Sequence, residues 1–443
     1  MIKKLEVSQN RFYKSIKKNL ILSCKNPELS IFTYLSNSDK FSFIKMQNIL
    51  FKRNFLKLIF IYLKNTLSFF YHYDYTIYKN DLKKDNKKLI ITWGKLSDFN
   101  TKGEFKDRYL GLKSNREKKT LWVIQYDEKF LPSKIAKNII IFKQNAKKSF
   151  YFFYLFKIFK NIKNKLFFLE NLSSGTLYAI NFHEKISKEI KHKKISEVLM
   201  PYEGQLVQKY FIKKIKKHNI DITGYIHTYP QPIPFNLFNY NSCSPQKLIV
   251  SSKTLKKMLV NFFNWKKNQI SIEKSRRFFR DKKINMSKKI FLPYQINESK
   301  KLLLLFIEYL KNSNNHKLPI FEIMIHPTKI NDEIHKLFKD EIEKIINNNQ
   351  IKFTDSKKNK TSIFFGYTSA IIEALERGTK VIQICSEPIL EVYTPLFVKE
   401  ISCEKINQYT YVYTLKKKNS LIQMSNNILS KIFLIFCLNI HPW

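Results

Sequence analysis

The segment IFFGYTSAIIEALERGTKVIQI (Ile363–Ile384) decides the fold expected for this chain. An apolar run ends at Gly366, apolar residues at helical spacing follow, and a second apolar run begins directly after Gly378. This order predicts a strand, a short helix and a second strand parallel to the first, which is the repeating unit of α/β proteins.

The start of the helix expected in this segment has the residues of an anion site. Thr368 and Ser369 stand where side-chain oxygens cap free N–H groups, and the same N–H groups attract a phosphate. Gly366 would let a ligand approach the backbone closely, and Glu373 would accept hydrogen bonds from ribose hydroxyls. An ordinary strand-to-helix turn, in which Thr368 and Ser369 only cap the helix, explains the same residues, and both interpretations stay open here.

The alternation of strands and helices continues on both sides of this segment. In the second half we expect strands at 290–293, 320–325, 362–365 and 380–384 with helices at 298–311, 332–346 and 368–377. In the first half we expect strands at 89–93, 120–126, 198–200, 222–227 and 247–251 with helices at 205–218 and 253–263. The predicted fold class is α/β, with two Rossmann-like, doubly wound units that face each other across a cleft.

Composition shifts divide the chain into four parts. We expect a basic, acceptor-side α/β domain at 1–270, of which 1–88 is a helical or irregular lead-in, and a polar linker at 271–288. A nucleotide-binding α/β domain is expected at 289–410 and a helical tail at 411–443.

The charge is distributed unevenly. The 443 residues include 80 Lys and Arg against 35 Asp and Glu, but residues 320–443 contain 16 against 13. The excess therefore lies in residues 1–319, and a partner for that part would be anionic: a membrane surface, an acidic glycan or nucleic acid. We find no nucleic-acid-reading motif, so nucleic acid is the least favoured of the three.

Other features restrict the class of protein. With 44% apolar residues the chain can bury large cores, which excludes general disorder. We find neither an apolar run of about 18 residues nor a signal-like start, and the five cysteines are scattered, as expected of a reduced, cytoplasmic protein.

Two segments mix lysines with many aromatic residues. Phe51–Tyr71 and Ser149–Leu169 could each lie in a bilayer interface, with rings in the acyl boundary and ammonium groups at the phosphates. A packed helix whose lysines extend to solvent fits both segments as well.

His326 and Pro327 directly follow a predicted strand of the second half. Ligands of open α/β sheets bind outside the carboxyl ends of the strands, so His326 and Thr368 could share one crevice. A histidine there can donate a hydrogen bond to a phosphate. A purely structural histidine at a strand end is the alternative.

Two candidate bases follow strands of the first half. Glu203, in PYEGQ, could accept a proton from an attacking hydroxyl, or it could simply balance the dipole of the next helix. His227, at the end of ITGYIH, competes with Glu203 for the role of base.

A glycine-containing loop follows the first predicted strand of this half. Its marked residues could bind the acceptor or close the cleft, and a purely structural loop is equally compatible; they are Gly94, Asp98, Gly103, Asp107 and Arg108.

Several chemistries lack their motifs. The sequence has no GxxxxGK[ST] phosphate loop, no HExxH, no Cys/His cluster and no GxSxG elbow. We therefore predict neither a metal ion nor a resident cofactor.

Taken together, the two α/β halves, His326-Pro327 and the run GYTSAIIEALERG resemble glycosyltransferases of the GT-B fold. The His-Pro and Thr368-Ser369 pairs are similar to motifs of bacterial sialyltransferases that use CMP-activated sugars. PYEGQLVQKY and GYIHTYPQPIPFNLF look like stretches of bacterial surface-carbohydrate biosynthesis proteins of the capsule or O-antigen type.

This resemblance implies a function. The chain would transfer a sugar from a nucleotide-sugar donor, CMP-linked in preference, to a surface glycan or lipid-linked acceptor, as a peripheral enzyme on the inner face of the cytoplasmic membrane. It implies Glu203 as general base and His326, Thr368 and Ser369 as donor ligands. The sialyltransferase-like acidic motif has two acids before its glycine, whereas Tyr202 precedes Glu203-Gly204 here. The alternative is a non-catalytic protein on a degenerate transferase scaffold that binds polyanions or membranes.

Overall fold

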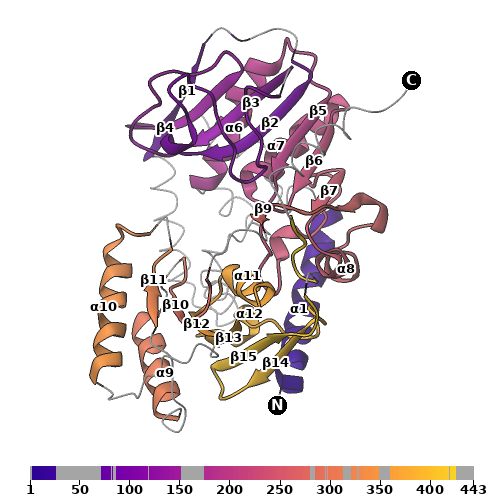
Figure 1. Cartoon of the computed structure of the whole chain (residues 1–443). Coiled ribbons are helices and arrows are strands. Elements are labelled where there is room, and N and C mark those ends of the chain that lie inside the picture. The colour runs from indigo at the N-terminus through magenta and orange to yellow at the C-terminus, as the bar shows by residue number, and fades with distance from the viewer. Residues whose placement is uncertain are drawn as a thin grey trace.

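The computed structural model describes residues 2–25, 71–80, 82, 86–117, 119–150, 174–279, 285–294, 296, 298–312, 321–326, 329–348, 360–418 and 420–425. Within these residues the chain is a mixed α/β protein with two large, mostly parallel sheets, which lie one above the other in Figure 1. The aromatic-basic stretches 51–70 and 151–173 fall outside the described residues. Among the described helices, none has the length and apolar character that a membrane span requires.

The first sheet has eight strands. Their spatial order is β1 (Tyr71–Lys79), β4 (Ile139–Phe150), β3 (Thr120–Tyr126), β2 (Lys88–Gly94), β5 (Glu197–Pro201), β6 (Asp221–Tyr225), β7 (Lys247–Val250) and β8 (Ile270–Ile272). Only the edge pair β1–β4 is antiparallel. The order reverses between β2 and β5, which makes their carboxyl ends the position where ligands of such sheets bind.

The second sheet has six strands. Their order is β11 (Glu322–Met324), β10 (Lys289–Phe291), β12 (Thr361–Phe365), β13 (Lys380–Ile384), β15 (Thr410–Leu415) and β14 (Ile401–Lys405). The first four strands are parallel, and β15 pairs antiparallel with both β13 and β14. Here the order reverses between β10 and β12, so this sheet also has a ligand-binding edge.

Helices and short turns connect and cover the strands. The α-helices are α1 (Ile2–Lys25), α6 (Ser174–Ile190), α7 (Leu206–Ile215), α8 (Lys253–Phe262), α9 (Ser299–Asn312), α10 (Glu333–Asn348), α11 (Ala370–Glu376) and α12 (Pro388–Glu391). The 3₁₀ turns are η3 (Leu96–Asp98), η4 (Lys216–His218), η5 (Phe235–Leu237) and η6 (Lys267–Gln269). A small parallel pair joins β9 (Ser275–Phe279) to β16 (Met424–Ser425).

Alternation along the strands sorts their side chains into separate cores. Leu89 and Ile91 of β2 belong to the core beneath α6, α7 and α8, whereas Ile90 between them faces Phe105 and Leu110 on the other side. That second face is covered by residues 95–117, and the described β2–β3 and β3–β4 connections contain no α-helix. The first sheet therefore departs from the expected doubly wound form, in which helices cover both faces.

One core continues from the first sheet to the second. The same apolar cluster contains Phe211 and Phe263 from the first-sheet side and Phe364, Ile371 and Tyr393 from the second-sheet side. A separate cluster fills the space between the opposite face of the second sheet and helices α9 and α10.

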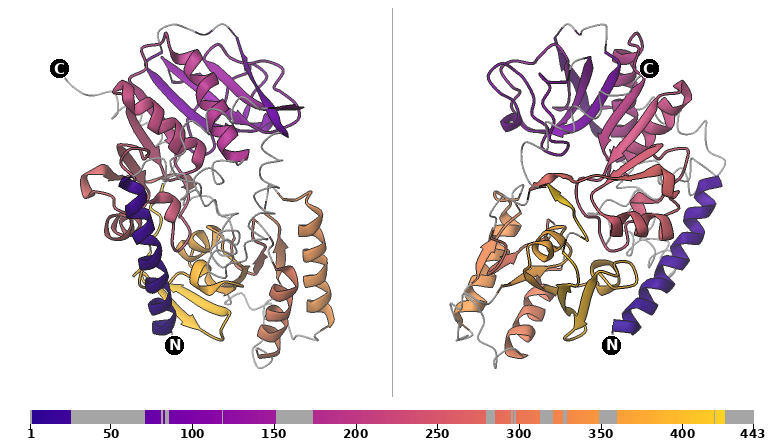
Figure 2. Two further views of the ribbon diagram at one scale, coloured as in Figure 1. Left: turned by 180° about the vertical axis from the view of Figure 1, so that it is seen from behind. Right: turned by 45° about the vertical axis from the view of Figure 1, so that its right-hand side comes forward.

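The N-terminal helix α1 contacts both sheets, although we expected residues 1–270 to group together. Its Gln9 is fully buried and donates to the carbonyls of Ile389 (3.0 Å) and Val392 (2.8 Å) near α12. The Tyr13 hydroxyl donates to the Phe262 carbonyl of α8. Figure 2 shows α1 running along the side of the molecule past both units.

Two boundary expectations differ from the structure as well. The expected linker at 271–288 contains β9, because Ser275 hydrogen-bonds Gln423 and β9 pairs with β16. The helical tail expected from residue 411 begins inside strand β15, whose tyrosines Tyr411 and Tyr413 are buried in the shared core. Residues 426–443 lie outside the described residues.

Candidate active site

One cavity of about 860 Å³ lies between the carboxyl edges of the two sheets. Gly94, Glu203 and His227 line it from the first sheet, and His326, Gly366 and Thr368 line it from the second. Its volume is in the range of about 300–1,000 Å³ that is common for small-molecule sites. The residues predicted from separate parts of the sequence thus face one hollow.

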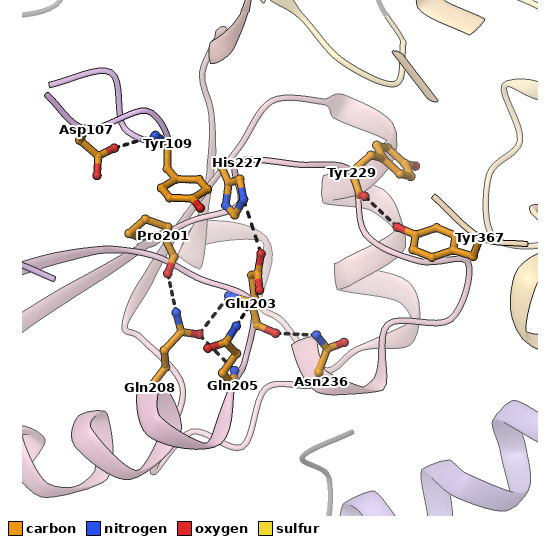
Figure 3. A network of polar contacts seen from close by, with 10 residues as sticks. All are labelled: Asp107, Tyr109, Pro201, Glu203, Gln205, Gln208, His227, Tyr229, Asn236 and Tyr367. Carbon is orange, nitrogen blue, oxygen red and sulfur yellow. Dashed lines mark hydrogen bonds and ion pairs between the residues drawn. The ribbon is translucent and has the colours of Figure 1, made fainter. Parts of the chain in front are cut away.

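The turn after β5 is held in one conformation by α7. The Gln208 side-chain oxygen accepts from the backbone N–H groups of Glu203 (3.0 Å) and Gln205 (3.1 Å), and its amide nitrogen donates to the Pro201 carbonyl (2.6 Å; Figure 3). The Asn236 amide donates to the Glu203 carbonyl. These bonds fix the backbone of Glu203 while its side chain remains in the cavity wall.

The Glu203 carboxylate contacts two polar side chains. Gln205 donates to Oε2 at 2.8 Å, and the His227 Nε2 atom lies 3.5 Å from Oε1 (Figure 3). The Glu203 side chain is 40% exposed and lines the hollow. Partial burial raises its pKa above the usual value, whereas the hydrogen bond from Gln205 and the charge of Arg277 act in the opposite direction. A carboxyl group with a raised pKa is suited to accept a proton near neutral pH.

His227 has a different environment from Glu203. Its ring is buried and packs edge-on against Tyr109, with 4.7 Å between ring centroids. Burial and the nearby Arg277 lower its pKa to about 3, so the ring is neutral at pH 7. The buried Nδ1 atom has no hydrogen-bond partner among the residues that the structure describes.

The loop after β2 places Arg108 and Tyr109 at the cavity, and buried Asp107 forms the turn that does so. Asp107 accepts from the backbone N–H of Tyr109 (2.7 Å), from that of Leu110 and from the Thr92 hydroxyl. Burial raises the pKa of Asp107 to about 6.

Asp98 supports the same loop. Its Oδ2 atom accepts from Arg108 Nη2 at 2.7 Å and from the Lys95 backbone N–H at 2.9 Å. Of the five loop residues marked in the sequence, Gly94 and Arg108 line the cavity, whereas Asp98 and Asp107 support the loop from behind. Gly103 packs against the Lys134 backbone, away from the cavity.

The second-sheet wall differs in part from expectation. Gly366, Thr368 and Ser369 line the cavity, but α11 begins at Ala370 and Ser369 makes no side-chain capping bond. The Thr368 hydroxyl accepts from the Ala370 backbone N–H at 3.3 Å.

Glu373 does not reach the cavity, which corrects its expected contact with ribose. Its Oε1 atom accepts from Nε (3.1 Å) and Nη2 (2.9 Å) of Arg377, one helical turn further on. This ion pair directs the carboxylate along α11 and away from the hollow.

His326 faces the cavity from the end of β11. Its ring packs edge-on against Tyr294 at 5.2 Å, and burial and the surrounding cations lower its pKa, with Arg277 the largest of the charge effects. Pro327 lies outside the described residues.

Tyrosines close the inner end of the cleft. Tyr367 donates to the Tyr229 carbonyl at 3.2 Å (Figure 3), and Tyr393 donates to the Pro230 carbonyl at 2.7 Å. The proline-rich loop after β6 is thereby attached to the second sheet at the cavity floor.

Sequence reasoning missed several cavity residues. Arg277 lies in the expected linker, and Gln144, Tyr178 and Tyr294 carry no motif. In SRRFF two adjacent arginines precede two adjacent phenylalanines, so no period-2 alternation marks 275–279 as a strand.

In the part of the chain that the structure describes, no group of three His, Cys, Asp or Glu side chains could hold a metal ion. No protein-family profile and no curated protein matches the chain.

Proposed function

We propose that this chain is a glycosyltransferase of the GT-B type. It would transfer a sugar from a nucleotide-sugar donor, CMP-linked in preference, to a surface glycan or lipid-linked acceptor. The observation that carries the proposal is the cavity at the carboxyl edges of both sheets, with a carboxylate in one wall and an imidazole and hydroxyls in the other.

The two candidate bases are not equivalent in this geometry. A neutral histidine with a pKa of about 3 is a weak base at pH 7, whereas Glu203 has a raised pKa and an exposed carboxylate. We therefore assign the base to Glu203. His227 contacts Glu203 and helps to hold its carboxylate in place.

The proposed reaction is one direct displacement. The acceptor hydroxyl gives its proton to the Glu203 carboxylate while its oxygen forms a bond to the anomeric carbon. The bond from that carbon to the donor phosphate breaks, and its electron pair stays on the phosphate oxygen. His326, Thr368 and Ser369 are the second-sheet side chains at hand to hydrogen-bond that phosphate.

The proposal is tested with Glu203→Gln. The purified chain is incubated with CMP-, UDP-, GDP- and ADP-sugars and bacterial glycan acceptors, and release of the nucleotide is measured. We expect Glu203→Gln to lower turnover about 10²- to 10⁴-fold with nucleotide affinity retained, because only the proton acceptor is lost. The acid limb of the wild-type pH profile should lie above the ordinary pKa of a glutamate, since protonated Glu203 cannot accept a proton.

Glu373→Gln is the matched control. This carboxylate is paired with Arg377 outside the cavity, so its loss should leave turnover unchanged. Equal activity of wild type and Glu203→Gln, or binding of none of the four nucleotides by the wild type, would contradict the proposal.

A further inference from the structure

A cluster of cations stands where the two sheets meet at the cavity. Arg277 of β9 and Lys95 of the loop after β2 line the hollow together with His326 of the second sheet. The charges of both Arg277 and Lys95 lower the pKa of His326, and the charge of Arg277 also lowers the pKa of Glu203 and of His227. Arg277 is therefore close to both walls of the cavity.

The backbone of Arg277 is firmly held. Buried Ser275 accepts from the N–H groups of Arg277 (3.2 Å) and Phe278 (3.0 Å) through its hydroxyl, and its own N–H donates to the Gln423 carbonyl at 2.7 Å. The Arg276 N–H donates to the Tyr225 hydroxyl at 2.9 Å, at the end of β6. The position of residue 277 is thus determined by contacts to β6 and to the segment before β16.

The side chains of the two neighbouring arginines differ. Arg276 pairs with Glu273 at 2.8 Å and stacks over the Tyr225 ring at 5.3 Å. Arg277 is exposed and lies over the Phe278 ring at 5.4 Å, and among the described residues neither Arg277 nor Lys95 is paired with a carboxylate. Two unpaired cations beside an imidazole in a concave wall attract an anion.

We infer that Arg277 and Lys95 bind the donor phosphate together with His326, Thr368 and Ser369, which line the same cavity. This inference rests on the proposed function. As the bond to the anomeric carbon breaks, the phosphate gains negative charge, and a guanidinium in place stabilises that charge. A planar guanidinium can donate two parallel hydrogen bonds to a phosphate, which a lysine cannot.

The test compares phosphate-bearing and phosphate-free ligands. The full-length chain is titrated by calorimetry with CMP, UMP, GMP and AMP, and with cytidine, uridine, guanosine and adenosine. The gain in affinity from each nucleoside to its monophosphate measures what the phosphate group contributes to binding. We expect Arg277→Ala to reduce this gain about 10- to 100-fold and Lys95→Ala to reduce it less, while Arg277→Lys retains part of it.

Arg276→Ala is the control, because it removes an arginine of the same strand whose guanidinium is already paired. It should leave the phosphate gain unchanged. Arg277 is exposed, so its variants are expected to fold, and the nucleoside affinities check that the rest of the site is intact.

The outcomes separate the two proposals. If the wild type shows a phosphate gain that Arg277→Ala preserves, the inference is wrong and the proposed function stands. If the wild type binds none of the nucleotides, both are wrong. A further titration uses a glucuronic-acid oligosaccharide. If binding of this oligosaccharide, and not the phosphate gain, depends on Arg277, the cations serve an acidic acceptor and the inference is overturned.

Discussion

At the scale of single residues, the geometry of the candidate base depends on Gly204. This residue has φ of +66°, and a Cβ atom placed on it would lie 1.9 Å from the Asn236 carbonyl oxygen. The same Asn236 donates from its side chain to the Glu203 carbonyl. No side chain can be accommodated at position 204 unless the turn and the Asn236 segment separate.

We predict that Gly204→Ala lowers the free energy of unfolding by about 3–5 kcal/mol, because a clash with backbone adds to the strain of a positive φ. Urea denaturation measures the loss. Gly378→Ala is the control, since Gly378 has φ of +79° with no atom within 4 Å of the added Cβ. It should cost only about 1–2 kcal/mol, and equal losses in the two variants would show that the Asn236 contact is unimportant.

The site residues that could be identified from the sequence are those that directly follow a predicted strand. Glu203, His227, His326 and Thr368 were found because each follows a strand, and parallel strands place such residues at one edge of a sheet. Glu373 was misplaced because only the structure shows its pairing with Arg377. The side of β9 that faces the cavity depends on the pairing of β9 with β16, and β16 lies about 150 residues further along the chain.

At the scale of elements, α1 shows most clearly how the parts are held together. Its buried Gln9 uses its amide nitrogen for two carbonyls near α12 and accepts from the Thr394 hydroxyl with its oxygen. On the same helix, Tyr13 contacts α8 through its hydroxyl and Phe397 through its ring. One helix thus attaches to elements of both sheets.

We predict that Gln9→Ala destabilises the chain by about 2–4 kcal/mol, because it leaves two buried carbonyls and a hydroxyl without their partner. Thermal or urea unfolding measures this. The control is Ser8→Ala on the same helix, whose exposed hydroxyl bonds only to the Lys4 carbonyl and whose loss should change stability by no more than about 0.5 kcal/mol. A Gln9 variant as stable as the Ser8 variant would mean that α1 adds little to the assembly.

The elements that the sequence predicted are those with short, regular patterns. Strands β2, β3, β6 and β7 and helices α7 and α8 lie close to the expected positions, because their apolar runs are bounded by polar or glycine residues. The expected start of α11 is two residues early, and β1, β4, β14 and β15 were missed. The buried tyrosines of β15 and the lysines of β4 obscure the apolar–polar alternation that is typical of a strand. The position of each of these strands in its sheet depends on partners that are distant in sequence.

At the scale of the whole molecule, the shared core distinguishes this chain from two independent units joined by a linker. The apolar cluster that begins under α7 and α8 continues to α11 and β15 without interruption, and the tyrosine contacts to residues 229 and 230 lie at its cavity end. Buried surface therefore holds the two walls of the candidate site together, and Glu203 and His326 face the same hollow.

We predict from this that the two sheets unfold together. Trp443 lies outside the described residues, so the measurement uses a Trp443→Phe chain, whose remaining tryptophans Trp93, Trp122 and Trp265 all lie in the first-sheet unit. Their fluorescence follows that unit, whereas far-ultraviolet circular dichroism follows both. The two signals should give one coincident urea transition, because losing either half exposes the core of the other. A truncated chain of residues 1–270 should fail to fold cooperatively for the same reason. Two separated transitions, or a stable 1–270 fragment, would show that each sheet has a core that is sufficient for it to fold alone. A bound ligand would then be needed to bring the two cavity walls together.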